Sequence, residues 1–156
     1  MRIALFPGTF DPFTNGHLDI VQKGLTLFDE VIVAVGENAS KKTMFDLDTR
    51  MSWINACFKD EPRVKVKHYS GLTIHFCKEV KTNFILRGLR TIGDFEYEKQ
   101  IAMVNADLAP AVQSVFVLSE QKYTAVSSTV IRDLILHGGN YQPYLPEGVI
   151  IDEAPA

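Results

Sequence analysis

Residues 1–35 read MRIALFPGTFDPFTNGHLDIVQKGLTLFDEVIVAV and contain a strand pattern, a helix pattern and a second strand pattern in that order. The apolar run from Ile3 to Phe6 predicts a short strand that ends at Pro7-Gly8. Apolar residues at helical spacing predict a helix from about Asn15 to Phe28, and the β-branched run from Val31 to Val35 predicts a buried strand. This order is typical of a right-handed β-α-β unit, in which both strands lie parallel in one sheet.

The rest of the chain continues the same alternation of strands and helices. Val64 and Val66 alternate with charged residues, a pattern that is typical of a half-exposed edge strand. The whole pattern predicts an α/β fold with a doubly wound, five-stranded parallel sheet and helices on both faces. Ligands bind such sheets beyond the carboxyl ends of the strands, so the residues after each strand are the functional candidates. The further elements we expect are helices over 46–58, 73–80, 93–108 and 127–137, and strands over 83–87 (closed by Gly88) and 114–118.

The length, net charge and cysteine content of the chain exclude several classes of protein. The chain has 156 residues, which predicts a single domain over 1–156, and its net charge is −3. That charge argues against general binding to nucleic acid or to a membrane surface. Cys57 and Cys77 make neither a disulfide framework nor a zinc motif, and no signal peptide or membrane span is evident. We therefore expect a cytoplasmic globular protein.

The loop after the first strand, residues 7–17, is the most informative segment. Gly8 allows a ligand to approach the backbone, Thr9 offers a hydroxyl, and His17 falls in the first turn of a helix whose N–H groups favour phosphate. The alternative is that Thr14 or Asn15 caps the helix and that His17 is a surface residue. The loop lacks both the Walker pattern and the dinucleotide-binding pattern.

Cationic residues follow two other strands. Lys41 and Lys42 follow the second strand and suit either a phosphate site or a solvated loop. Arg87 and Arg90 end the fourth strand, where they suit either bidentate binding of phosphate or structural salt bridges. The acidic partners for such bridges would be Asp94, Glu96 or Glu98.

The segment after the fifth strand combines small hydroxyl side chains with a cation. Ser127, Ser128 and Thr129 begin a helix, and Arg132 follows one turn later. Hydroxyl groups at a helix N-terminus both cap it and bind phosphate, so this segment is either a plain cap or part of an anion site.

Two of these segments resemble known motifs. Residues 14–17 (TNGH) and 126–132 (VSSTVIR) are similar to the (T/H)xGH and ISSTxxR signatures of the nucleotidyltransferase superfamily. Within that superfamily, residues 6–17, 40–45 (SKKTMF) and 87–98 (RGLRTIGDFEYE) resemble the bacterial phosphopantetheine adenylyltransferases of coenzyme A synthesis. Val126 stands where the family has isoleucine, and Thr73 stands where an apolar residue is common, so only a backbone role carries over to Thr73.

The resemblance implies a Rossmann-like fold and a reaction. ATP and 4′-phosphopantetheine would give dephospho-coenzyme A and pyrophosphate by direct in-line attack, with Mg²⁺ accompanying ATP and six identical chains forming a hexamer. His17 would stabilise the transition state. The resemblance implies that ATP binds Thr9, Phe10, His17, Gly88, Leu89, Arg90, Glu98, Tyr123, Thr124, Ala125, Val126, Ser127, Ser128 and Thr129, and that 4′-phosphopantetheine binds Thr9, Lys41, Thr73 and Arg87.

Several alternatives stay open on the sequence. The acceptor could instead be nicotinamide mononucleotide, glycerol phosphate or a similar phosphate, or the chain could be a flavodoxin-like binding module without catalysis. Ile101 and Val104 on the long helix suit either the core or a subunit contact, and the tail after Pro146 suits either a docking segment or a frayed end.

Overall fold

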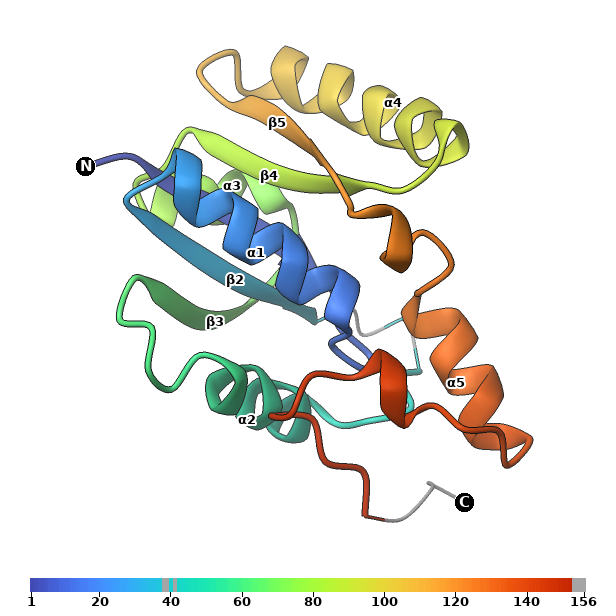
Figure 1. The fold of residues 1–156 in the computed structure, drawn as a ribbon. Coiled ribbons are helices and arrows are strands. Elements are labelled where there is room, and N and C mark those ends of the chain that lie inside the picture. Colours follow the sequence, from blue (N-terminus) through green and yellow to red (C-terminus); the bar gives the residue numbers. More distant parts are fainter. Residues whose placement is uncertain (38–39, 41, 153–156) are drawn as a thin grey trace.

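The computed structural model describes residues 1–37, 40 and 42–152 and confirms the α/β fold (Figure 1). Five parallel strands form one sheet in the order β3-β2-β1-β4-β5. The order reverses between β1 and β4, and this is where a doubly wound sheet binds its ligands. The strands are β1 (Ile3–Gly8), β2 (Glu30–Glu37), β3 (Val64–Ser70), β4 (Phe84–Leu89) and β5 (Gln113–Leu118).

The helices lie where the apolar spacing predicts them, within about two residues at each end, as is usual for helix boundaries. They are α1 (Asn15–Leu27), α2 (Leu47–Cys57), α3 (Thr73–Glu79), α4 (Ile92–Leu108) and α5 (Ser128–Leu136), with single 3₁₀ turns η1 (Gln121–Tyr123) and η2 (Gln142–Tyr144). No helix among the described residues combines the length and apolar character that a membrane crossing requires.

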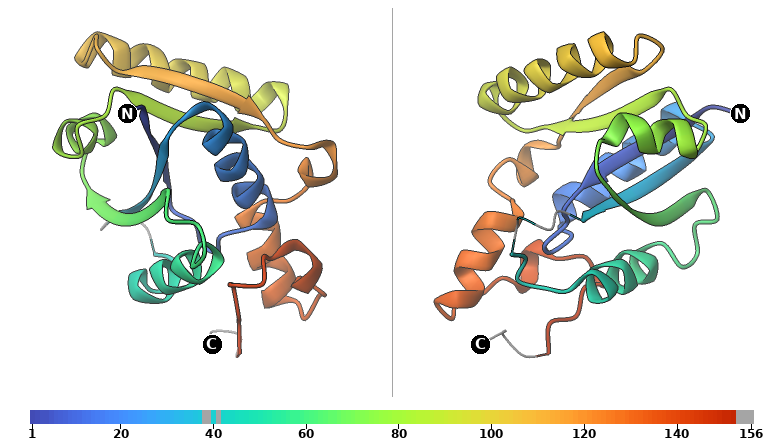
Figure 2. Two further views of the ribbon diagram at one scale, coloured as in Figure 1. Left: turned by 60° about the vertical axis from the view of Figure 1, so that its left-hand side comes forward. Right: turned by 180° about the vertical axis from the view of Figure 1, so that it is seen from behind.

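Side chains that alternate along the central strands build two apolar layers. Ala4 and Phe6 point to the face that α1 covers, whereas Leu5 points to the face that α3 covers. In Figure 1, α1 lies in front of the sheet and α3 behind it, and the view from behind in Figure 2 brings α3 to the front. The expectation of helices on both faces is therefore confirmed.

Two predicted strand ends are wrong. Pro7 does not stop β1, because β4 pairs with β1 only at Ala4 and Leu5, so the missing N–H of Pro7 costs no ladder bond on that side. Gly88 does not close β4, which pairs with β5 as far as Leu89. Gly88 is needed there because a Cβ atom would lie 2.6 Å from Cγ1 of Ile20 on α1. Arg87 thus lies inside β4 and is not its last residue.

The tail is a docking segment as far as Ile151. Leu145, Val149 and Ile151 are buried in the same apolar cluster as α2. A Cβ atom on Gly148 would lie 2.5 Å from the amide nitrogen of Cys57, so the chain passes directly over the end of α2. The predicted edge strand is β3, where Lys65 and Lys67 are exposed; charged side chains on an edge strand disfavour pairing with other chains.

Candidate functional site

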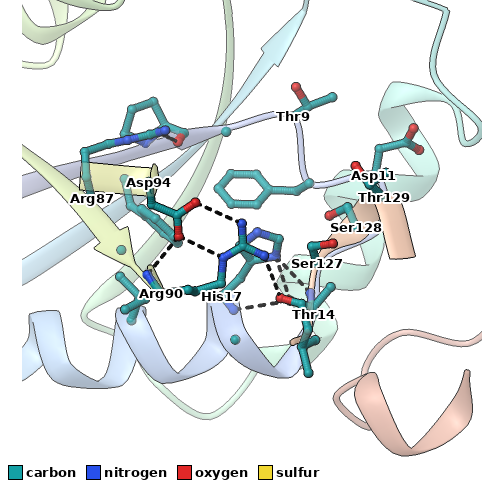
Figure 3. Close-up of a pocket in the computed structure, with 18 of the residues that line it drawn as sticks. Thr9, Asp11, Thr14, His17, Arg87, Arg90, Asp94, Ser127, Ser128 and Thr129 are labelled. Carbon is teal, nitrogen blue, oxygen red and sulfur yellow. Dashed lines mark hydrogen bonds and ion pairs between the residues drawn. The ribbon is translucent and has the colours of Figure 1, made fainter. Parts of the chain in front are cut away.

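A cleft of about 440 Å³ opens at the carboxyl ends of β1 and β4 (Figure 3). It lies at the reversal of strand order, where the N-termini of α1 and α5 also converge. Both helix termini present N–H groups and partial positive charge to it. The residues that line it and carry polar groups are Thr9, Asp11, Thr14, His17, Lys42, Thr43, Arg87, Arg90, Asp94, Glu98, Ser119, Ser127, Ser128, Thr129 and Arg132.

The loop after β1 forms the floor of the cleft. Phe10 has a φ of 52°, in the left-handed region that a bulky residue rarely adopts. Its ring lies over Gly8, where a Cβ atom would be 2.7 Å from the ring. The side chain of Phe10 is therefore buried, while Thr9 is exposed and lines the cleft.

His17 is fixed by a capping box at the start of α1. Thr14 is the N-cap residue, and its backbone N–H donates to Nδ1 of His17 at 3.0 Å. The rings of Phe6, Phe10 and Phe13 surround the imidazole at centroid distances of 5.0 to 6.3 Å. Burial, with smaller contributions from Arg90 and Arg87, lowers the pKa of His17 to about 3.

These contacts define the protonation of His17. The imidazole is neutral at pH 7, and Nδ1 accepts a hydrogen bond, so the ring proton is on Nε2. A neutral imidazole with its proton on Nε2 is a fixed hydrogen-bond donor in the cleft. The alternative of a surface histidine is wrong, although Thr14 caps the helix as the sequence suggested.

Arg90 is held at the mouth of the cleft. Its guanidinium binds the carboxylate of Asp94 at 3.1 Å and donates to the backbone oxygen of Val126 at 3.1 Å. Figure 3 shows Arg90 and Asp94 side by side next to His17. The arginine holds the pKa of the Asp94 carboxyl below its usual range, against the opposing effect of burial.

Arg87 is held by Glu98. Its Nε donates to Oε2 of Glu98 at 2.8 Å, its Nη2 binds Oε1, and its Nη1 donates to the backbone oxygen of Pro7. The salt bridges that the sequence left open as an alternative are therefore present at both arginines. The two carboxylates, four residues apart on α4, each have a cation beside them.

The N-terminus of α5 carries the predicted hydroxyl groups. Ser127 caps the helix through the N–H of Val130, and Ser128 donates to the backbone oxygen of Pro12 at 2.7 Å. Arg132 donates to the backbone oxygen of Asp11 at 2.7 Å. The capping alternative is thus realised at Ser127, which lines the same cleft as His17.

A second cavity of about 790 Å³ adjoins the first. Arg87 and Glu98 line both cavities, as does Thr9. Thr73 lines the second cavity, and its hydroxyl is 2.9 Å from that of Tyr69. An elongated molecule could therefore occupy the second cavity with one end reaching the first.

Not every predicted site residue lies at these cavities. The side chain of Leu89 is buried in the sheet, and Leu89, Tyr123, Thr124 and Ala125 line neither of the two cavities. Lys41 lies outside the described residues, whereas Lys42 lines the first cleft. The sequence did not single out Asp11, Asp94 and Ser119 as residues that line the cleft. It also did not indicate that Thr14 is the hydrogen-bond partner of His17. The position of Asp11 between a strand end and a helix was the available signal.

Within residues 1–37, 40 and 42–152, no three His, Cys, Asp or Glu side chains form a group that could hold a metal ion. Burial raises the pKa of both Cys57 and Cys77 to about 11, so both are thiols at neutral pH, as expected of packing residues.

Comparison with known proteins places this geometry in a family. Residues 5–134 match the family model described as cytidylyltransferase-like. The phosphopantetheine adenylyltransferase of Flavobacterium johnsoniae is 49% identical over 149 residues, covering 96% of this chain and 97% of the relative. That of Phocaeicola vulgatus is 47% identical over 152 residues, covering 97% of this chain and 100% of the relative.

A solved structure shares the fold. It is a bifunctional NMN adenylyltransferase/ADP ribose pyrophosphatase from Francisella tularensis, complexed with AMP and a manganese ion. It superposes with a TM-score of 0.70 at 18% identity, over 94% of this chain and 44% of that one. Sequence and fold agree, and the chain belongs to the family of the phosphopantetheine adenylyltransferases.

Proposed function

We propose that this chain transfers the adenylyl group of ATP to 4′-phosphopantetheine, giving dephospho-coenzyme A and pyrophosphate. The observation that carries the proposal is the pair of cavities that share Arg87, Glu98 and Thr9. The first cavity has the cations and helix N-termini that a triphosphate requires, and the second, of about 790 Å³, has room for the pantetheine arm. The close relatives of the chain are named for the same reaction.

The reaction needs no general base. The phosphate monoester of the acceptor has a second pKa of about 6 and is largely dianionic at pH 7. One of its oxygens attacks the α-phosphorus of ATP, a new P–O–P bond forms, and pyrophosphate leaves with the electrons of the broken bond. Catalysis then consists of positioning two anions and neutralising charge at the phosphorus, without a covalent intermediate.

The neutral His17 suits this task. Its Nε2–H donates to an α-phosphate oxygen as negative charge grows there, and Nδ1 is held by Thr14, so the ring does not reorient. Arg90, Lys42 and Arg132 supply positive charge on the same cleft. Thr9, Phe10 and the residues from Val126 to Thr129, which line the same cleft, hold the nucleotide.

Magnesium enters with the nucleotide in this proposal. The cleft carboxylates are already engaged, since Asp11 accepts two backbone N–H groups, Asp94 binds Arg90 and Glu98 binds Arg87. Mg²⁺ in such sites is often held by substrate phosphates and water with few protein ligands, which fits this lining. Its chemical contribution is neutralisation of phosphate charge.

The cytoplasmic location stays a prediction from sequence.

The experiment is product analysis with competing acceptors. The purified protein is incubated with ATP, Mg²⁺ and either 4′-phosphopantetheine, nicotinamide mononucleotide or glycerol phosphate. Pyrophosphate release and the mass of dephospho-coenzyme A in the first reaction alone support the proposal. Product from another acceptor alone assigns that acceptor instead, and no pyrophosphate in any reaction indicates a binding module.

The pH profile tests the state of His17. We expect kcat/KM for 4′-phosphopantetheine to fall below pH about 6, because the acceptor phosphate becomes monoanionic there. His17, with a pKa of about 3, stays neutral throughout this range. His17→Gln should therefore lower the rate and leave the midpoint of the acid limb unchanged. An acid limb that disappears in His17→Gln would assign it to the histidine.

We also propose that the chain forms a homohexamer through α4. Glu98 is the one buried residue of this 17-residue helix, and its exposed large apolar side chains are Ile92, Phe95, Tyr97, Ile101, Met103, Val104 and Leu108. So many exposed apolar side chains on one helix are typical of an association surface. Ile101 and Val104 are thus not core residues in the isolated chain.

Light scattering on the purified protein tests this association. We expect six times the chain mass of 17.5 kDa. Val104→Lys should shift the protein to smaller species, because a charge in an apolar contact is costly. The control is Leu27→Lys, which changes an exposed leucine at the end of α1. A monomeric wild type, or equal behaviour of the two variants, would contradict the assignment to α4.

A further inference from the structure

Two charged side chains beside the cleft are almost fully buried. Asp11 is 4% exposed on the loop after β1, and Arg50 is 3% exposed on α2. Charged groups are rarely buried to this extent unless hydrogen bonds or opposite charges satisfy them. Neither side chain belongs to the reaction as described above, so the groups that each one binds indicate what it does.

The carboxylate of Asp11 holds two successive backbone amides. Its Oδ2 accepts from the N–H of Met44 at 2.8 Å, and its Oδ1 accepts from the N–H of Phe45 at 2.9 Å. The loop after β1 is thereby joined to the segment that precedes α2, more than thirty residues away in the chain. Arg132 binds the backbone oxygen of Asp11 and its guanidinium lies 3.9 Å from the carboxylate.

Arg50 holds the same segment through its carbonyl groups. Its Nε donates to the backbone oxygen of Phe45 at 3.0 Å, and its Nη1 donates to that of Thr9 at 2.6 Å. The carboxylate of Asp11 thus binds the N–H groups of residues 44–45, and the guanidinium of Arg50 binds the carbonyl of Phe45. Both charges also tie this segment to the floor of the cleft, at Thr9 and at Asp11.

We propose that Asp11 and Arg50 are positioning residues that fix the segment 42–45 against the Thr9 edge of the cleft. Lys42 and Thr43 line the cleft immediately before the two clamped amides, and Thr9 borders both cavities. Fixing these groups in advance lowers the entropy cost of binding a phosphate. The guanidinium of Arg132, 3.9 Å from the carboxylate of Asp11, also offsets its negative charge, which would otherwise repel an anionic substrate.

The substrate part of this inference rests on the proposed function, but the clamp itself does not. Two variants test it. Asp11→Asn keeps one acceptor oxygen and places an NH₂ group against a backbone N–H, and Arg50→Lys keeps the charge but cannot bridge the two carbonyl groups. Either variant serves if the other fails to fold.

Two readouts separate the clamp from general stability. Hydrogen exchange without substrate should show the amides of Met44 and Phe45 exchanging about tenfold faster in either variant. Steady-state kinetics should show KM for 4′-phosphopantetheine raised about tenfold, KM for MgATP raised less, and kcat lowered by no more than about threefold.

The matched control is Thr82→Val. Thr82 is 5% exposed, and its hydroxyl donates to the backbone oxygen of Ile3 and accepts from the N–H of Phe84, at the end of the sheet opposite the cleft. This variant should lose stability and change neither readout.

Each outcome decides one part of the proposal. Unchanged exchange at Met44 and Phe45 overturns the clamp, and faster exchange with unchanged KM overturns its role in positioning. The same change of KM in Thr82→Val assigns the effect to stability and overturns the proposal. A wild type that makes no dephospho-coenzyme A overturns the proposed function instead, and the exchange measurement still decides whether the clamp exists.

Discussion

Replacing His17 with alanine is expected to lower kcat by on the order of 10²- to 10³-fold, the usual effect of removing one fixed donor from developing charge. The affinity for MgATP should change by less than about tenfold, because the hydrogen bond strengthens only as charge grows on the α-phosphate. The donor is well fixed, since Thr14 holds Nδ1 and three phenylalanine rings surround the imidazole. Single-turnover kinetics and nucleotide binding by calorimetry measure the two quantities separately.

His75→Ala is the matched control for this experiment. His75 is an exposed histidine on α3, on the other face of the sheet, so its loss should change neither quantity. The capping box gives His17 a structural role too, and the thermal midpoint of each variant records that cost. An unchanged kcat with weakened nucleotide binding would assign His17 to the ground state and remove its role in the transition state.

The fold was largely predictable because each element has its own local pattern. The run from Val31 to Val35 is β-branched and buried on both faces, and the apolar spacing of residues 15–28 gives the amphipathic face of α1. The strand ends at Pro7 and Gly88 were not predictable, because they depend on where β4 diverges from β1 and on the approach of Ile20. Both features depend on how separate elements pack together, so the residues around Pro7 and Gly88 carry no sequence pattern that would reveal them.

The place of the site at the sheet edge was predictable from the sequence, but the partners of its charged side chains were not. Candidates that follow β1, β2, β4 and β5 meet in one cleft, and Thr73 after β3 lines the neighbouring cavity, because parallel strands end at one edge of the sheet. The sequence could not choose between Asp94, Glu96 and Glu98 as partners of the arginines, because that choice depends on how α4 is rotated against β4. Glu98 is the buried one. The clamp of Asp11 needs two segments of remote sequence, which a single motif does not contain.

The charges of the cleft explain how a chain of net charge −3 can hold two phosphate-bearing substrates. Three arginines line the cleft, and each lies beside one carboxylate: Arg87 with Glu98, Arg90 with Asp94 and Arg132 with Asp11. The carboxylates hold the guanidinium groups in place before the substrate arrives. Lys42 and the two helix N-termini then leave a local positive excess for the phosphates.

Replacing Arg87 with alanine is the second change for which we expect a large effect. We expect kcat/KM for 4′-phosphopantetheine to fall by on the order of 10²-fold, because a charged contact is lost and Glu98 remains buried without its cation. The free energy of unfolding should fall by about 1 to 3 kcal/mol for the same reason. Arg63→Ala is the control, because Arg63 makes a similar pair with Glu61 on the exposed surface, where ion pairs contribute little.

The double variant Arg87→Ala/Glu98→Gln separates the two causes. If part of the loss comes from the uncompensated carboxylate, which lines both cavities, neutralising it should recover about tenfold of kcat/KM relative to Arg87→Ala alone. The remainder then measures the contact of Arg87 with the acceptor phosphate. Full recovery would show that Arg87 serves only to neutralise Glu98. An equal rise in KM for MgATP in the single variant would contradict its assignment to the acceptor, because the arginine would then serve the nucleotide as much as the pantetheine phosphate.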